Sequence, residues 1–276
     1  MTHDGDARHA HEGTYAGLSA ELDGTSDQRP PLVLLHGLTF DRSMWNAALA
    51  EHRRIDPARQ TMSLDLPGHG RSAPAESYGM DAVVDAVHDA IEAAGLARPV
   101  MVGHSLAAIV ATMYATRHST SGVVNVDQSL RTEQFAAFLR SMAEQLRGPT
   151  FPSIWGGFLA SMHIELLPPD AQQLLHATST PDQELVLGYW DDVLNRDPAE
   201  MNAMAAAGLA NLRARNVPYM YVVGHELDAQ DRAWLVEQLP QTTIKIMPGS
   251  GHFPQLAHPA AFATCLRETA DWTTDG

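Results

Sequence analysis

A short apolar strand that passes directly into a helix is the feature that most restricts the fold of this chain. The strand is Val100–Val102, and a helical stretch of small residues, Leu106–Tyr114, follows after only three residues. So sharp a turn requires a residue without a Cβ, which Gly103 provides. The side chain at the apex then stands at the carboxyl edge of a sheet, at the positive end of a helix. That side chain is Ser105. The usual pattern is G-x-S-x-G, and Ala107 at the last position is still small enough for close packing.

Five further apolar runs have the short, non-alternating pattern of strands that are covered on both faces. They are Leu32–Leu35, Thr61–Leu66, Val123–Val126, Tyr219–Val223 and Ile244–Met247. Amphipathic or capped stretches between and after them predict helices from Met80 to Gly95, from Asp228 to Leu239 and from Pro259 to Trp272. Strands that alternate with helices predict an α/β fold, with a mainly parallel sheet and helices on both faces.

One long segment interrupts this alternation. Between Val126 and Val217 no strand-like run occurs, and residues 130–215 have a helical pattern rich in Met, Ala and aromatic side chains. A second independent domain would leave the sheet without its last strands, so an inserted helical cap is the better interpretation. We therefore expect a core of residues 1–128 and 216–276, and a cap of residues 129–215. The large aromatic residues of the cap are Phe135, Phe138, Phe151, Trp155, Phe158, Tyr189 and Trp190.

Charge and cysteine content exclude several classes of function. The net charge is −15, from 33 acidic and 18 basic residues, so a nucleic acid partner is not expected. No apolar stretch approaches membrane-spanning length, and the polar N-terminus lacks the apolar core of a signal peptide, which together predict a cytoplasmic protein without a membrane partner. Cys265 is the one cysteine. It is predicted to lie in the core, and no cysteine-based metal site can form. His3, His9 and His11 are interpreted as a solvated tail.

Four motifs at fitting positions carry a family resemblance. They are His36-Gly37-Leu38, the loop Asp65–Ser72, the turn at Ser105, and Gly251-His252-Phe253-Pro254. With these motifs at the ends of the predicted strands, the chain resembles the α/β-hydrolase superfamily in its capped form, from about Tyr15 to Trp272. The resemblance implies the α/β-hydrolase fold: a mainly parallel sheet with helices on both faces and an inserted helical cap.

The resemblance also implies a set of catalytic residues. A serine hydroxyl is a weak nucleophile that needs a nearby base, and the base needs an acid to orient it. Ser105 is the predicted nucleophile and His252, in a glycine-flanked loop after the last strand, is the predicted base. The family's oxyanion hole uses backbone N–H groups, which here belong to Leu38 and Leu106. No metal or other cofactor is implied.

Several other histidines could be considered for the role of the base. His36 and His69 belong to turn motifs that are mostly structural in the family, and His225 lies beside the usual position of the acid. His104 precedes the nucleophile and is expected to point away from it. The loop Asp65–Ser72 is interpreted as a structural turn, because no phosphate-binding G-K-[ST] sequence follows it.

The acid has two candidates. Most of the family carries it in a G-x-x-D pattern after the penultimate strand, where this chain has Gly224-His-Glu-Leu227-Asp228. The matching position is Leu227, which cannot orient an imidazole. Some relatives instead place the acid after the strand that follows the nucleophile helix, which here is Asp127. We favour Asp127 and keep Asp228 as the alternative.

These residues predict a serine hydrolase that cleaves a carboxylic ester or lactone through an acyl-enzyme on Ser105. Because an aromatic and Met-rich cap would cover the site, the expected partner is a small apolar ester or lactone. A carbon–carbon bond hydrolase on the same framework is one alternative. A small-molecule receptor of the same fold, with little turnover, is another. A serine at position 105 excludes relatives that use an aspartate nucleophile. The oligomeric state is left open.

Overall fold

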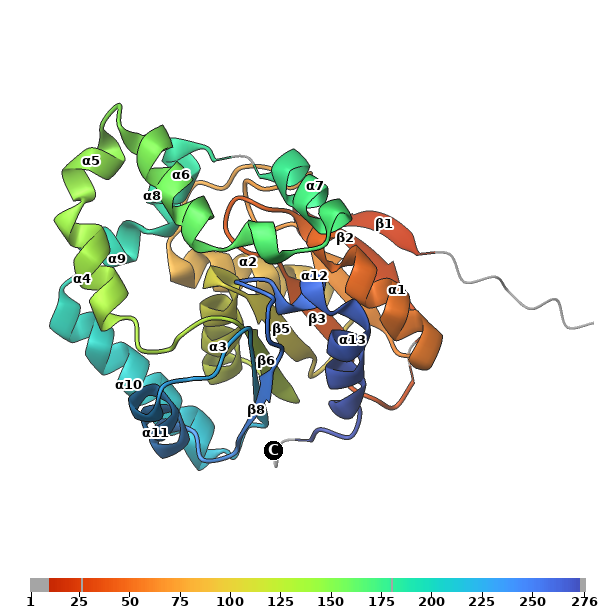
Figure 1. Ribbon diagram of the computed structural model, residues 1–276. Coiled ribbons are helices and arrows are strands. Elements are labelled where there is room, and N and C mark those ends of the chain that lie inside the picture. Colours follow the sequence, from red (N-terminus) through yellow and green to blue (C-terminus); the bar gives the residue numbers. More distant parts are fainter. Residues whose placement is uncertain (1–9, 26, 180, 274–276) are drawn as a thin grey trace, which may run out of the picture.

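A twisted sheet forms the centre of the molecule (Figure 1). The computed structural model describes residues 10–25, 27–179 and 181–273. Within them the sheet has eight strands in the order β1-β2-β4-β3-β5-β6-β7-β8. Strands β3 to β8 run parallel, whereas β1 and β2 join the edge antiparallel. The strands are β1 His11–Tyr15, β2 Leu18–Asp23, β3 Leu32–Leu35, β4 Thr61–Leu64, β5 Val100–His104, β6 Gly122–Val126, β7 Tyr219–Val223 and β8 Thr242–Ile246.

Helices connect and cover these strands (Figure 1). Those flanking the sheet are α1 Asn46–Ile55, α2 Met80–Ala93, α3 Leu106–Arg117, α11 Ala229–Gln238, α12 Pro254–Ala257 and α13 Pro259–Glu268, with the short 3-10 turn η1 Arg42–Trp45. Between β6 and β7 lie α4 Glu133–Ser141, α5 Ala143–Arg147, α6 Phe151–Ser161, η2 Ile164–Leu166, α7 Pro169–Thr178, α8 Gln183–Tyr189, α9 Asp191–Asn195 and α10 Pro198–Ala214. We call residues 127–218 the β6–β7 segment.

The two faces of the sheet bury separate apolar clusters, because successive side chains of a strand point to opposite faces. Val33 and Leu35 of β3 pack with the apolar residues of α2 and α3, whereas Leu32 and Leu34 pack with α1 and α13. All four strand residues are fully buried. This double coverage explains why the parallel strands read as continuous apolar runs. The predicted α/β fold is confirmed, and the parallel strands begin and end within about two residues of their predicted positions.

The hairpin β1–β2 was not predicted from the sequence. Its turn places Ala16 and Gly17 at positive φ, and its first strand has exposed residues because it lies at the edge of the sheet. Short, half-polar edge strands carry little hydrophobic pattern. The interpretation of His11 as tail is therefore wrong, since it is the first residue of β1. His3 and His9 lie outside the described residues.

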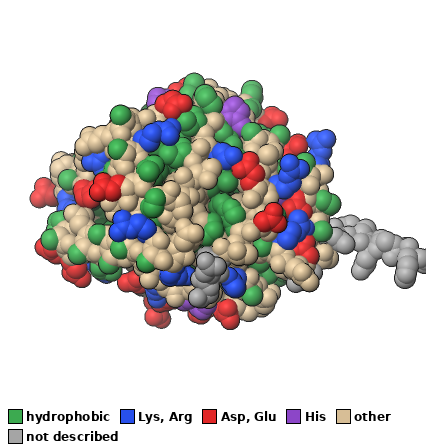
Figure 2. All heavy atoms as spheres, turned by 90° about the horizontal axis from the view of Figure 1, so that it is seen from below, with side chains coloured by type: hydrophobic (Ala, Val, Ile, Leu, Met, Phe, Trp, Pro, Cys, Tyr) green, Lys and Arg blue, Asp and Glu red, His purple; other side chains and the backbone are tan. Residues whose placement is uncertain are grey.

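Cys265 of α13 is buried, as expected, and burial raises the pKa of its thiol to about 11. Among the described residues no helix is both long and apolar enough to cross a lipid bilayer. Figure 2 shows the face that is viewed from below Figure 1. Acidic and basic side chains are interspersed around its margin, with apolar and uncharged atoms between them. This face therefore carries no broad basic surface.

The fold brings the candidate site residues to one edge of the sheet. Because β3, β5, β6, β7 and β8 are parallel, the loops that follow them all emerge at the carboxyl edge. These loops hold Leu38, Ser105, Asp127, Gly224 and His252 respectively. Residues far apart in the sequence are thereby collected at one place, as is usual for sites of open parallel sheets.

Candidate active site

The predicted nucleophile occupies a strained turn between β5 and α3. Ser105 has φ 54° and ψ −135°, a conformation that L-residues rarely adopt and that is typical of functional sites. Its N–H is held by the carbonyl of Val126 at 2.9 Å. A Cβ on Gly103 would lie 2.3 Å from the carbonyl oxygen of Ala107, so only glycine fits there. Ala107 itself is fully buried, so the turn accommodates its methyl group.

The structure pairs His252 with Asp127. The Nδ1 of His252 lies 2.7 Å from Oδ2 of Asp127, and the other carboxylate oxygen accepts the N–H of Gly224 at 3.1 Å. Burial by itself would raise the pKa of Asp127. The hydrogen bond and charge of His252, together with the Gly224 N–H, outweigh burial and hold that pKa below its ordinary value. The acid is therefore ionised at neutral pH, and the imidazole is oriented with Nε2 left available.

Asp228 has a different role. Its side chain caps α11 by accepting the backbone N–H groups of Gln230 and Asp231, each at 2.8 Å. Glu226, on the other side of Leu227, faces Arg232 at 3.6 Å. The carboxylate that meets His252 is thus the one after β6. Asp127 also has a positive φ of 57°, which aspartate tolerates better than most residues.

The two candidate oxyanion donors lie on either side of the nucleophile. Leu106 is the first residue of α3, so its N–H has no acceptor within the helix. On the other side, a Cβ on Gly37 would lie 3.4 Å from the Cβ of Ser105, which places the loop after β3 against the nucleophile. Leu38 follows in this loop and is almost fully buried. Thr39 comes next, with φ 69°.

Two buried histidines hold these loops together. The Nε2 of His69 accepts the N–H of Thr39 at 3.0 Å, and its Nδ1 donates to the carbonyl of Pro67. The Nε2 of His36 accepts the N–H of Leu66 at 2.9 Å. Desolvation lowers the pKa of His36 to about 4 and that of His69 to about 3, so both are neutral. Their predicted structural role matches these contacts.

The loop Asp65–Ser72 is a turn organised by a buried carboxylate. Asp65 accepts the backbone N–H groups of Arg42 and Arg71 at 2.9 and 3.0 Å, and it forms an ion pair with the Arg42 guanidinium. A Cβ on Gly70 would lie 2.4 Å from the side-chain carboxyl carbon of Asp65, so glycine is required there. The Arg71 guanidinium pairs with Glu12 of β1.

His104 has contacts that the sequence did not indicate. Its Nε2 lies 2.8 Å from the backbone carbonyl of His252, and the two imidazole rings are 4.8 Å apart. The N–H of His252 in turn donates to the carbonyl of Met162, in the β6–β7 segment, at 3.0 Å. The pairing of β5 with β6 and the reach of the β8 loop create these contacts, which no local sequence pattern signals.

Aromatic side chains gather in the β6–β7 segment. Phe158 lies within about 6 Å of the rings of Phe135, Phe138, Trp155 and Trp190. Trp155 and Trp190 are buried, whereas Phe135 and Phe138 are 43% and 49% exposed. The cluster is therefore the core of this segment on one side and an apolar surface on the other.

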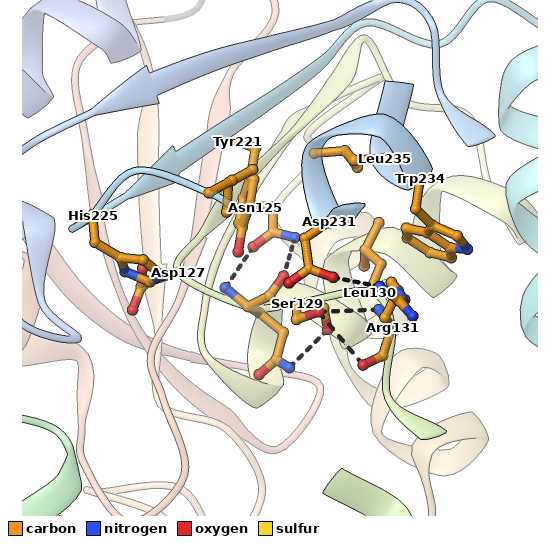
Figure 3. Close-up of a pocket in the computed structure, with 12 residues that line it drawn as sticks. Asn125, Asp127, Ser129, Leu130, Arg131, Tyr221, His225, Asp231, Trp234 and Leu235 are labelled. Carbon is orange, nitrogen blue, oxygen red and sulfur yellow. Dashed lines mark hydrogen bonds and ion pairs between the residues drawn. The ribbon is translucent and has the colours of Figure 1, made fainter. Parts of the chain in front are cut away.

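A cavity of about 220 Å³ lies beside Asp127 (Figure 3). It is bounded by the loop after β6, the end of β7 and helix α11, and it includes Leu227. Figure 3 labels Asp127 and His225 among the residues that line it, and it shows an ion pair between Arg131 and Asp231. Its lining residues are Asn125, Asp127, Gln128, Ser129, Leu130, Arg131, Tyr221, His225, Leu227, Asp231, Trp234 and Leu235. Ser105 and His252 are outside this set.

Comparison with known proteins agrees with this architecture. The model of the alpha/beta hydrolase family matches residues 32–264. A 2-succinyl-6-hydroxy-2,4-cyclohexadiene-1-carboxylate synthase of Enterobacter sp. is 26% identical, over 87% of this chain and 91% of its own. A pimeloyl-[acyl-carrier protein] methyl ester esterase of Neisseria meningitidis is 28% identical, over 90% and 96%. The crystal structure of an enol-lactonase from Burkholderia xenovorans superposes with a TM-score of 0.71 at 16% identity, covering 94% of this chain and 99% of that one.

Proposed function

Because the chain belongs to the alpha/beta hydrolase family, we propose that it is a serine hydrolase that cleaves a carboxylic ester or lactone. The observation that carries the proposal is the 2.7 Å contact between His252 Nδ1 and Asp127. It occurs together with a serine in a strained strand-to-helix turn, whose preceding residue His104 contacts the His252 carbonyl. An anionic acid fixes the imidazole as the Nδ1–H tautomer and leaves Nε2 as a base. A serine with such a base can act as the nucleophile of an acyl-transfer reaction.

The reaction proceeds in two halves. The Ser105 hydroxyl attacks the substrate carbonyl while His252 Nε2 takes its proton, and the negative charge on the carbonyl oxygen is stabilised by the N–H groups of Leu38 and Leu106. Protonated His252 then gives its proton to the leaving alcohol, and an acyl-enzyme remains on Ser105. Water, deprotonated by the same imidazole, attacks this ester, and the acid is released with Ser105 restored.

The β6–β7 segment supports an apolar substrate. Its Met162 carbonyl binds the backbone of the base, so the segment lies against the site as a cap would. Its side chains near that contact are apolar, including the partly buried Leu159 and Met162. Two similar proteins have names that specify an ester and a lactone, which favours this bond class over others. We therefore assign a small, predominantly apolar ester or lactone as the substrate.

A panel of p-nitrophenyl esters, aliphatic lactones and vinylogous diketones tests the proposal. We expect hydrolysis of short esters or lactones, stoichiometric labelling of Ser105 by a fluorophosphonate, and loss of both in Ser105→Ala. Removal of the nucleophile alone typically lowers kcat by ~10⁶. The diketone is included because a carbon–carbon bond hydrolase on the same framework is the alternative function. Diketone cleavage without any ester or lactone hydrolysis would refute the proposed bond class.

A further inference from the structure

Three hydrogen bonds hold the base His252. Its ring Nδ1 meets Asp127 at 2.7 Å, and its backbone N–H donates to the Met162 carbonyl at 3.0 Å. Its backbone carbonyl accepts a hydrogen bond from Nε2 of His104 at 2.8 Å. The first contact orients the ring and the second comes from the β6–β7 segment. The third comes from the residue that directly precedes the nucleophile.

We propose that His104 is a positioning residue for the base, acting through this bond to the His252 carbonyl. The proposal rests on the proposed function, in which His252 must reach Ser105. Since residues 104 and 105 are consecutive, the bond ties the main chain of the base to the chain that carries the nucleophile. The separation of the two reacting groups is thereby set within the fold rather than by the substrate.

The chemistry of the bond fixes the state of His104. A carbonyl oxygen only accepts hydrogen bonds, so Nε2 of His104 carries the hydrogen. Among the described residues its Nδ1 is buried without a hydrogen-bond partner. An unpaired buried acceptor is unfavourable, and a phenyl ring would fill the same space without one. What an imidazole adds at this position is therefore the Nε2–H donor.

Packing makes the donor rigid. The His104 ring is fully buried and stacks on Phe253, the neighbour of the base, at 5.1 Å between centroids and 29° between planes. On its other edge, a Cβ on Gly37 would lie 2.6 Å from Nδ1. The ring thus lies between the loop after β3, which carries the candidate oxyanion donor Leu38, and the loop of the base. It cannot rotate away from the carbonyl without displacing one of them.

A matched pair of substitutions separates the bond from the packing. In His104→Gln the side-chain amide nitrogen can reach the position of Nε2 and donate, whereas His104→Met has a similar length and no donor. Fluorophosphonate titration counts competent sites, so that kcat is expressed per folded active site, and thermal unfolding reports stability separately. We expect His104→Met to lower kcat per titrated site by about 10- to 100-fold, the cost of a sub-ångström misplacement of a catalytic group. We expect KM within about twofold of wild type, and kcat of His104→Gln within about threefold.

Two results overturn the positioning role. One is a kcat per titrated site in His104→Met that equals wild type. The other is an equal loss in the Gln and Met variants, because then the imidazole shape, and not its donor, is what matters. Both leave the proposed function intact, because wild-type Ser105 would still be labelled. Absence of labelling and of hydrolysis in the wild type refutes the proposed function, and the role of His104 with it.

Discussion

Replacement of Asp127 by asparagine is the most direct test of the site. The new amide can still accept the Gly224 N–H through its oxygen, so its NH₂ group must face Nδ1 of His252. An NH₂ donor cannot bind an Nδ1–H donor, so Nδ1 must become the acceptor. The imidazole is thereby forced into the tautomer that carries its hydrogen on Nε2. Nε2 then points a hydrogen at Ser105 instead of a lone pair. Serine hydrolases that are trapped in this tautomer lose ~10⁴ in kcat, equivalent to ~5 kcal/mol of transition-state stabilisation.

The assay is hydrolysis of a p-nitrophenyl ester at pH 8, with kcat expressed per active site. KM should change little, because Asp127 does not contact the substrate in the proposed mechanism. Asp228→Asn is the matched control, since asparagine caps α11 as well as aspartate does and activity should be unaffected. A kcat of Asp127→Asn within tenfold of wild type would refute the assignment. Equal losses in the two variants would also refute it.

Two further predictions concern acid pH and the cavity. Burial holds four neutral histidines in the fold with pKa values of about 3 or 4: His36, His52, His69 and His104. The unfolded chain protonates them near pH 6.5, so their contribution to stability is complete above that pH and is lost as pH falls toward 4. At pH 5 the four histidines together lower the free energy of unfolding by up to ~8 kcal/mol relative to a pH well above 6.5, which is comparable to the whole unfolding free energy of a protein. Urea midpoints that are equal at pH 7 and pH 5 would contradict this. Second, Asp127→Gly keeps the positive φ and opens a carboxylate-sized space toward the 220 Å³ cavity. Sodium formate at ~0.5 M should restore its kcat by at least tenfold, and sodium chloride at equal ionic strength should not.

The sequence predicted the parallel part of the sheet because its strands are buried on both faces. Residues such as Val33 are fully buried and must be apolar, so the strand can be predicted from its apolar run without any tertiary information. The edge hairpin β1–β2 was missed for the opposite reason. The edge strand β1 is paired on one side only, and its Glu12 forms ion pairs with Arg42 and Arg71, which lie 30 or more residues away. Such long-range ion pairs leave no local pattern.

The site was predicted unevenly, and for a related reason. Ser105 is recognisable because its own neighbours create the strained turn, beginning with Gly103. The acid is not recognisable in this way, since Asp127 and Asp228 both follow a buried strand. Only the groups that the two carboxylates contact in the folded structure distinguish them. Asp127 faces His252, whereas Asp228 turns back to cap its own helix. An N-cap preference of this kind is visible in sequence only once the start of the helix is known.

The histidine contacts carry a consequence for how the site is assembled. His252 depends on Asp127 after β6, on His104 at the end of β5 and on Met162 in the β6–β7 segment. A Cβ on Gly251 would lie 2.6 Å from the Met162 carbonyl, so the two loops meet without space for a side chain. Movement of the segment away from the sheet must therefore break a hydrogen bond of the base itself. If the segment acts as a cap, opening it for substrate also releases one of the three restraints on His252. Closure then restores that restraint.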